Sequence, residues 1–212
     1  MTDREHIPCI YVLAGTNGAG KSSLGGAMFR ESAAEYFDPD EAAQRFRAAN
    51  PRTTLEEANS AAWHQGKRLL HRAISERLDF AFETTLGGHT IARLLDQARS
   101  KKIEVRIWYV GLANPESHIA RVRARVIAGG HDIPEAKIRE RYDTSRFNLV
   151  NLMPKLTELR VFDNSEEGDP RRGVAPQPIL LLHMDHGEIV EICDLAMAPD
   201  WVKPILATAM KL

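Results

Sequence analysis

The 212-residue chain has little of what a metal-binding, secreted or membrane-spanning protein requires. It contains two cysteines, Cys9 and Cys193, which lie inside apolar runs and lack the spacing of a metal site. Thiols placed in this way are typical of a reducing compartment. No apolar stretch approaches the ~20 residues that a transmembrane helix needs. We therefore expect a cytoplasmic protein that makes no contact with a membrane.

The sequence also lacks an excess of either charge. It has 28 Lys and Arg residues against 29 Asp and Glu residues, which gives a formal net charge of −1. Such a balance provides no general attraction to nucleic acid, so any anion-binding site has to be local. Internal repeats and low-complexity tracts are missing as well. Because a chain of this length with 43% hydrophobic residues buries one sizeable core, we expect residues 1–212 to form one domain.

A local anion site is indicated by residues 15–22, which match the phosphate-binding pattern G-x-x-x-x-G-K-[ST] in full. The apolar run 9–14 precedes this phosphate loop and a helical pattern follows it, which is the context that the pattern needs. Its glycines allow positive φ, Lys21 can reach the β- and γ-phosphates, and Ser22 can offer its hydroxyl to Mg²⁺. The sequence therefore predicts a nucleotide site made by Gly15, Thr16, Asn17, Gly18, Ala19, Gly20, Lys21, Ser22 and Ser23.

The order of the predicted elements indicates an α/β fold of the phosphate-loop NTPase and kinase kind. Strands are expected at residues 8–14, 34–38, 79–83, 104–110 and 159–163, and helical patterns alternate with them. This alternation implies βαβ units and a five-stranded, mostly parallel sheet flanked by helices. Residues 178–212 are expected to add a β-hairpin and a last helix. Ligands of such folds bind beyond the carboxyl ends of the strands.

Three large classes of phosphate-loop protein lack their signatures in this chain. The sequence has no Leu-Ser-Gly-Gly-Gln segment of a transporter ATPase and no Asn-Lys-x-Asp segment of a GTPase. It also has no clear apolar run ending in Asp-Glu that would polarise a water for hydrolysis. The small kinases remain, in which an arginine-bearing lid closes over the phosphates and a carboxylate activates an acceptor hydroxyl.

Carboxylates that follow predicted strands can supply the acceptor chemistry. Asp38 suits the N-cap of the next helix, whereas Asp40 in its first turn stays free to act as a general base. Glu83 ends a buried strand and can orient the acceptor, or instead contact Lys21 or Mg²⁺ indirectly. His131 is read as a loop or capping residue.

Two arginine-bearing helical patterns form a candidate lid. The first begins at Pro115 and ends at Gly129-Gly130, a break that resembles a hinge, and the second begins near Pro134. We predict that Arg125 of the first and Arg141 of the second act on the phosphates, the alternative being that they are solvated surface residues.

These motifs together resemble the zeta-toxin family of phosphate-loop kinases over about residues 8–165. Besides the phosphate loop, the resemblance rests on the segments Phe37-Asp38-Pro39-Asp40, Phe82-Glu83-Thr84-Thr85, Gly129-Gly130-His131-Asp132-Ile133-Pro134, Arg141-Tyr142 and Asn148-Leu149. Family members of known activity use ATP and Mg²⁺ to phosphorylate the 3′-hydroxyl of the amino sugar in UDP-N-acetylglucosamine, and many are inhibited by an antitoxin.

The resemblance implies a role for each matching residue. Lys21 and Ser22 would hold ATP and Mg²⁺, and Asp40 would activate the acceptor hydroxyl. Glu83 and Thr84 would bind the acceptor. The lid arginines would be Arg125 and Arg141. The expected partners are then a small hydroxyl acceptor, first a nucleotide sugar, and a protein antitoxin.

Departures from the family pattern leave the acceptor open. Relatives often carry an arginine two residues after the lid tyrosine, where this chain has Thr144, with Arg146 as a possible substitute. A kinase for an antibiotic, nucleoside or sugar is therefore one alternative, and a regulatory ATPase that signals through a partner is another. Preference for ATP or GTP is open too, and residues 163–165 are the expected place for base contacts.

Overall fold

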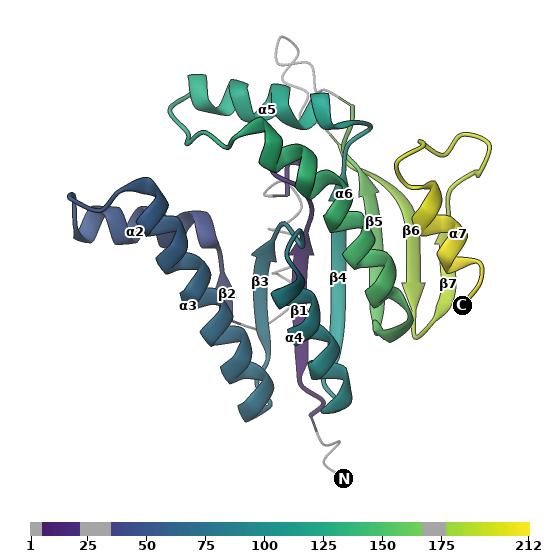
Figure 1. Cartoon of the computed structure of the whole chain (residues 1–212). Helices are drawn as coiled ribbons and strands as arrows, with labels where there is room; N and C mark the ends of the chain where they lie inside the picture. Colours follow the sequence, from purple (N-terminus) through teal and green to yellow (C-terminus); the bar gives the residue numbers. More distant parts are fainter. Residues whose placement is uncertain (1–5, 22–34, 167–176) are drawn as a thin grey trace.

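Seven strands form one sheet in the computed structural model, which describes residues 6–21, 35–166 and 177–212 (Figure 1). The strand order is β2-β3-β1-β4-β5-β6-β7. Neighbouring strands from β2 to β5 are parallel, whereas β6 and β7 are antiparallel to the strands beside them. The bounds are β1 (Cys9–Ala14), β2 (Glu35–Phe37), β3 (Phe80–Thr84), β4 (Glu104–Gly111), β5 (Glu158–Asp163), β6 (Ile179–Asp185) and β7 (Glu188–Ile192).

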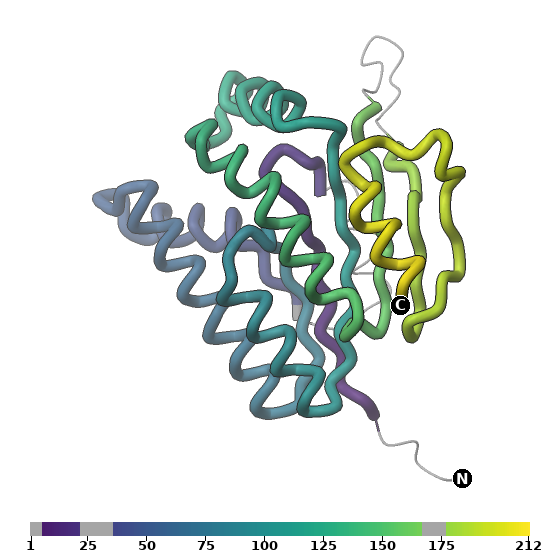
Figure 2. The backbone as a smooth tube through the Cα atoms, turned by 45° about the vertical axis from the view of Figure 1, so that its right-hand side comes forward, coloured from purple at the N-terminus to yellow at the C-terminus, as the bar shows by residue number. Residues whose placement is uncertain are grey.

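The described helices follow the strands in the predicted alternation. They are α2 (Pro39–Ala49), α3 (Leu55–Glu76), α4 (His89–Ser100), α5 (Pro115–Ile127), α6 (Glu135–Leu152) and α7 (Lys203–Ala209). Helices α3, α4 and α6 cover one face of the sheet, and α5 crosses above the end of the sheet before α6 runs back along it (Figures 1 and 2). The α/β fold with a mostly parallel sheet flanked by helices is thus as predicted. The helix expected at residues 22–33 lies outside the described residues.

Helix starts follow local capping signals in the sequence. The Asp38 carboxylate accepts a hydrogen bond from the backbone N–H of Asp40 at 2.7 Å, so Asp38 is the N-cap of α2 as predicted. Thr54 and Glu57 form a capping box that begins α3. Asn114 caps α5 by accepting from the Ser117 N–H at 2.8 Å. These caps direct α2 and α5 away from the carboxyl ends of β2 and β4.

The sheet buries side chains on both faces. Ile10 and Val12 of β1 belong to the large core, whereas Leu13, which follows Val12, belongs with Trp108 of β4 to a smaller cluster on the opposite face. This alternation is the period of two expected for a strand. The large core also contains Trp201, next to α7. Among the described residues, no helix is both long enough and apolar enough to span a membrane.

The C-terminal hairpin extends the sheet. It was expected as an addition beside a five-stranded sheet, but β6 pairs antiparallel with β5 and β7 with β6. The turn between them has positive φ at His186 (50°) and Gly187 (86°), which is the geometry of a tight hairpin turn. Residues 177–192 therefore cover the edge of β5 that would otherwise be open.

Candidate active site

The candidate site lies at the carboxyl ends of β1 and β3, where the phosphate loop, Glu83 and the start of α2 meet. Two cavities open there. One has a volume of about 330 Å³ and is lined by residues that include Gly18, Lys21 and Arg125. The other has a volume of about 500 Å³ and is lined by residues that include Trp63 and Arg141. We call them the phosphate-side and acceptor-side cavities. Asn17, Pro39, Asp40, Glu83, Thr84 and Thr85 line both.

Glycines of the phosphate loop are required by close backbone contacts. Gly15 has a φ of 144°, and a Cβ atom there would lie 2.2 Å from the carbonyl oxygen of Val110. Gly18 has a φ of 82°, and its Cβ would lie 2.6 Å from the carbonyl oxygen of His118. Side chains at these positions would force the loop away from β4 and α5. The loop backbone can therefore lie this close to β4 and α5 only because Gly15 and Gly18 have no side chains.

Buried polar side chains fix the same loop from outside. The Nδ1 atom of His118 lies 2.9 Å from the carbonyl oxygen of Asn17, which can only accept, so Nδ1 donates. Burial lowers the pKa of His118 to about 4, so the ring is neutral at pH 7. Asn164 donates from Nδ2 to the carbonyl oxygen of Ala19 at 2.8 Å and is itself buried. Asn164 thus supports the loop, and base contacts by residues 163–165 stay a prediction.

Lys21 and Glu83 form a largely buried ion pair. The ammonium group of Lys21 donates to the carbonyl oxygen of Gly15 at 3.0 Å and lies 3.4 Å from the Glu83 carboxylate. Burial raises the pKa of Glu83, and the positive charge of Lys21 opposes that rise. Tyr36 donates to the second oxygen of Glu83 at 3.5 Å. The contact between Glu83 and Lys21 was one of the two roles considered for Glu83 from sequence.

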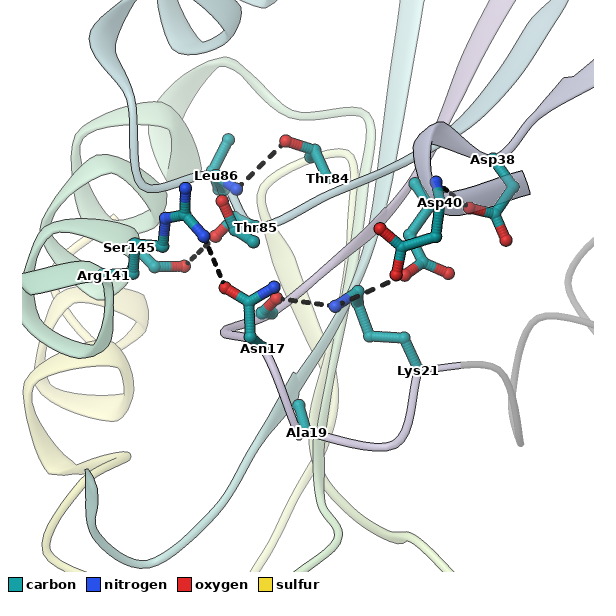
Figure 3. A network of polar contacts seen from close by, with 12 residues as sticks. Asn17, Ala19, Lys21, Asp38, Asp40, Thr84, Thr85, Leu86, Arg141 and Ser145 are labelled. Atoms are coloured by element: carbon teal, nitrogen blue, oxygen red, sulfur yellow. Dashed lines mark hydrogen bonds and ion pairs between the residues drawn. The ribbon is translucent and has the colours of Figure 1, made fainter. Parts of the chain in front are cut away.

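Asp40 is the more exposed of the two carboxylates that line both cavities, the other being Glu83. The Asp40 side chain is 46% exposed and lies 3.8 Å from Arg125 and 3.9 Å from His131. The close-up shows Asp40 and Lys21 pointing toward the same space, with Asp38 turned away to cap its helix (Figure 3). The Asp40 carboxylate is therefore accessible from both cavities. His131 was read as a loop residue, but it lines the acceptor-side cavity beside Asp40.

The two predicted lid arginines lie on different sides of the site. Arg125 lines the phosphate-side cavity, and its Nε and Nη2 atoms are buried without a hydrogen-bond partner among the described residues. Arg141 lines the acceptor-side cavity, and its Nη1 donates to Oδ1 of Asn17 at 2.7 Å (Figure 3). Burial lowers the pKa of the Arg141 guanidinium. A third arginine, Arg121, lines the phosphate-side cavity next to Arg125.

Arg146 does not replace the missing family arginine. Its guanidinium lies over the Tyr142 ring, 4.0 Å from the ring centroid, and it donates to the Asp143 carboxylate. It lines neither of the two cavities. Ser22 and Ser23, predicted for Mg²⁺ and nucleotide binding, lie outside the described residues.

Sequence reasoning missed the wall that α3 adds to the acceptor-side cavity. Asn59, Trp63 and Lys67 are four residues apart along α3 and line this cavity together. Their i, i+4 spacing places them on one helix face, which is a signal that the sequence contained. The position of α3 beside the phosphate loop depends on the strand order, which this local pattern does not specify.

Comparisons with known proteins agree with the fold. The model of the family described as Zeta toxin matches residues 1–168. An uncharacterized protein of Haemophilus influenzae is 35% identical over 129 residues, which cover 60% of this chain and 88% of that protein.

Two solved complexes are similar in structure. The AvrRxo1-ORF1:-ORF2 complex shares 13% identity at a TM-score of 0.69, over 95% of this chain and 65% of that chain, so this chain spans about two thirds of its length. A structure of the PezAT toxin-antitoxin system of Streptococcus pneumoniae shares 14% identity at a TM-score of 0.56, over 75% of this chain and 68% of that one.

Proposed function

Because the chain belongs to the zeta toxin family of phosphate-loop kinases, we propose that it transfers the γ-phosphoryl group of ATP to a hydroxyl group of a small molecule. A nucleotide sugar such as UDP-N-acetylglucosamine is the acceptor that we propose first. One observation carries the proposal: the phosphate-side and acceptor-side cavities meet at Asp40 and Glu83. A phosphoryl donor and a hydroxyl acceptor can therefore approach each other at a carboxylate.

The residues around the phosphate-side cavity fit a nucleoside triphosphate. Gly15 and Gly18 leave backbone space that a Cβ would fill, and Lys21 brings a buried ammonium group to the loop. Arg125 adds two buried N–H groups without a partner among the described residues, and an anion would satisfy them. Mg²⁺, when bound, would neutralise phosphate charge, with Ser22 as the ligand we propose. One structure of the AvrRxo1-ORF1:-ORF2 complex was solved with ATP, which supports this reading.

Asp40 is the base in this proposal. Its carboxylate would take the proton of the acceptor hydroxyl while the hydroxyl oxygen bonds to the γ-phosphorus and the bond to the β,γ-bridging oxygen breaks. Arg125, 3.8 Å away, would orient the carboxylate and then stabilise the charge on the transferred group. Glu83 and Thr84 would hold the acceptor, and Glu83 also keeps Lys21 in place at 3.4 Å. Arg141 would act from the acceptor side by fixing Asn17.

The test is a mass-spectrometric assay of the purified protein with ATP, Mg²⁺ and UDP-N-acetylglucosamine. We expect a product heavier by one phosphoryl group, lost with Lys21→Ala and reduced about 10²-fold or more with Asp40→Asn. Asp96→Asn is the matched control, because the Asp96 side chain is also 46% exposed and also lies beside a cation, Lys155. This control should retain full activity.

Other outcomes separate the alternatives. If ATP binds through Lys21 but no product forms, UDP-N-acetylglucosamine is the wrong acceptor and a metabolite extract should be searched for one. If ATP turnover is unchanged by Asp40→Asn, the protein is a regulatory ATPase and the kinase proposal is wrong.

A protein antitoxin is the partner that we propose. Support comes from the similar structures, since the PezAT structure is that of a toxin-antitoxin system. Expression of the chain in bacteria should slow growth, and Asp40→Asn should relieve the effect. Equal toxicity of the two proteins would contradict a toxin that acts through phosphoryl transfer.

A further inference from the structure

His131 follows the C-terminus of α5, where the sequence contains a break that resembles a hinge. The N–H of Gly129 donates to the carbonyl oxygen of Val126 at 3.0 Å, and the N–H of Gly130 donates to that of Arg125 at 2.9 Å. Gly129 has a φ of 92°, and together with these two hydrogen bonds it forms a Schellman cap on α5. The break is therefore a hydrogen-bonded cap, which turns the chain back toward Arg125.

Both ends of the loop that carries His131 are fixed. At its start, a Cβ atom on Gly130 would lie 2.7 Å from Cγ of Arg125, so the backbone passes directly against the stem of that side chain. At its end, Ile133 is buried in an apolar cluster with side chains of α5 and α6. His131 lies between these two anchors, and its place relative to Arg125 is set by the fold.

The cap brings two side chains to the two oxygens of Asp40. Nη1 of Arg125 lies 3.8 Å from Oδ2, and Nε2 of His131 lies 3.9 Å from Oδ1. Arg125 lines the phosphate-side cavity, whereas His131 lines the acceptor-side cavity. Each oxygen of a carboxylate can accept two hydrogen bonds, so an oxygen that is held by His131 can still accept from an acceptor hydroxyl.

Both contacts are longer than hydrogen bonds, and a third cavity leaves room for them to shorten. This cavity of about 420 Å³ lies between α2 and the loop, and its lining includes Asp40, Arg125 and His131. Hydrogen bonds of a catalytic site are often long without ligands and tighten when the ligands bind. A shift of about 1 Å would bring Nε2 and Oδ1 to hydrogen-bond distance.

We propose that His131 is a positioning residue for the base: its Nε2–H donates to Oδ1 of Asp40 while Arg125 holds Oδ2. With both oxygens held, the carboxylate cannot rotate, and a lone pair stays directed at the acceptor hydroxyl. Asp40 takes its role as base from the proposed kinase function, on which this inference rests.

Positioning requires no change of charge on His131. The neutral Nε2–H tautomer and the imidazolium both donate from Nε2. A proton relay through the ring is not needed either, because the Asp40 side chain is 46% exposed and can release its proton directly to water. His131 therefore acts through the geometry of Asp40.

The first test measures the contact without turnover. A crystal structure of the native protein with Mg²⁺ and a non-hydrolysable ATP analogue should show Nε2 of His131 at about 2.7–3.2 Å from Oδ1 of Asp40. A distance above about 3.5 Å would overturn the proposal. This measurement does not depend on the acceptor, so a failure of the proposed reaction and a failure of the contact can be told apart.

The second test measures kinetics in the product assay. His131→Ala should lower kcat about tenfold, the loss expected for one hydrogen bond to a charged group in an open site, and should change both KM values less than about threefold. His131→Gln keeps an N–H donor and should recover most of the loss. His183→Ala is the matched control, because the His183 side chain is 20% exposed against 22% for His131 and also lies beside a carboxylate, that of Glu158. The control should keep the native kcat.

Two kinetic results would contradict a positioning role. Equal losses of kcat with His131→Ala and His131→Gln would show that the donor is not what matters. A raised KM for the acceptor with an unchanged kcat would make His131 a contact of the acceptor instead.

A double-mutant cycle with Asp40→Asn separates positioning from a general effect on the fold. If His131 acts through the Asp40 carboxylate, His131→Ala should lower kcat by less than about twofold further in Asp40→Asn protein. A tenfold loss in both backgrounds would show that His131 acts independently of Asp40, and the proposal would be wrong.

Discussion

At the residue scale, His118 links the stability of the fold to the phosphate loop. Its ring is buried, donates to Asn17 and packs edge-on against Tyr142 with ring centroids 5.6 Å apart. A neutral imidazole suits this place, because a charged ring would lose its solvation there. The unfolded chain has no such restraint and protonates His118 at its ordinary pKa of 6.5.

Acid should therefore destabilise the protein through His118. The folded pKa of about 4 lies below the unfolded value of 6.5, so the unfolded state binds more protons between these two pH values. Stability from this group is fully present above pH 6.5 and is lost as the pH falls toward 4. The loss is on the order of 3 kcal/mol, from a difference of 2.5 pKa units at 1.36 kcal/mol each.

Urea unfolding of the native protein and of His118→Gln at several pH values between 4 and 7 checks this. The glutamine keeps a donor for Asn17 but does not titrate, so the stability advantage of the native protein over the variant should shrink as the pH falls. The exposed His64→Gln serves as the control and should show no such trend. A difference between native and His118→Gln proteins that is constant with pH would contradict the prediction.

At the scale of the elements, α3 and β2 contact each other at a glycine of α3, Gly66. A Cβ atom on Gly66 would lie 2.7 Å from Cε1 of the Phe37 ring, so α3 can approach β2 this closely only without a side chain at that point. Phe37 is buried and also lines the acceptor-side cavity. The glycine therefore sets the distance between two walls of the site.

Gly66→Ala should lower stability although alanine favours helices. Helix propensity alone would stabilise the protein by about 1 kcal/mol, whereas the clash with the buried Phe37 ring costs about 1–3 kcal/mol. We expect a net loss in urea unfolding, together with a raised KM for the acceptor. Ser60→Ala, at an exposed position of the same helix, should be neutral or slightly stabilising. Stabilisation by Gly66→Ala would show that α3 and β2 can move apart freely.

Most elements were predictable because their signals are local. The predicted cap at Asp38 and the strand alternation depend on residues near each other in sequence, and the structure confirms them; the caps at Thr54 and Asn114 are local in the same way. The pairing of β6 with β5 was not predictable, because an isolated hairpin pattern does not say which strand edge it will join. The ion pair between Arg139 of α6 and Glu116 of α5 likewise depends on how these two helices pack, which neither segment specifies alone.

Part of the candidate site was predictable from local sequence patterns, and part was not. The phosphate loop, Asp40 and Glu83 follow strand ends, and the parallel sheet brings them together. The positions of Trp63 and His131 depend on how α3 and the loop after α5 pack over that edge, which no local pattern encodes. The assignment of roles to these residues stays a prediction until the variants are measured.

At the scale of the whole molecule, the C-terminal segment completes the core of the sheet. Trp201 is 2% exposed and stands over β4, where a Cβ on Gly111 would lie 2.4 Å from its indole. Its ring centroid is 6.3 Å from that of Tyr109, and Arg146 donates to its carbonyl oxygen at 3.4 Å. Residues that follow the family match, which ends at residue 168, thus share one core with β4 and α6. This shared core is consistent with the prediction of one domain, which stays a prediction.

Removing the indole should destabilise the entire protein. Trp201→Ala is expected to cost about 3–5 kcal/mol in urea unfolding, as for other large aromatic residues in a core. Trp201→Phe should cost much less, because it keeps a ring and removes an indole N–H that is buried without a partner among the described residues. A loss below about 1 kcal/mol for Trp201→Ala would mean that the segment around α7 docks loosely.

The shared wall between the two cavities has a consequence for inhibitor design. Asn17, Pro39, Asp40, Glu83, Thr84 and Thr85 border both cavities, so the two proposed ligands would meet at this shared set of residues. A bisubstrate compound that joins a nucleotide to an acceptor through a short linker would cross only this boundary. Its second half would bind at a high effective concentration, and such a compound could exceed the affinity of either half by about 10²-fold or more.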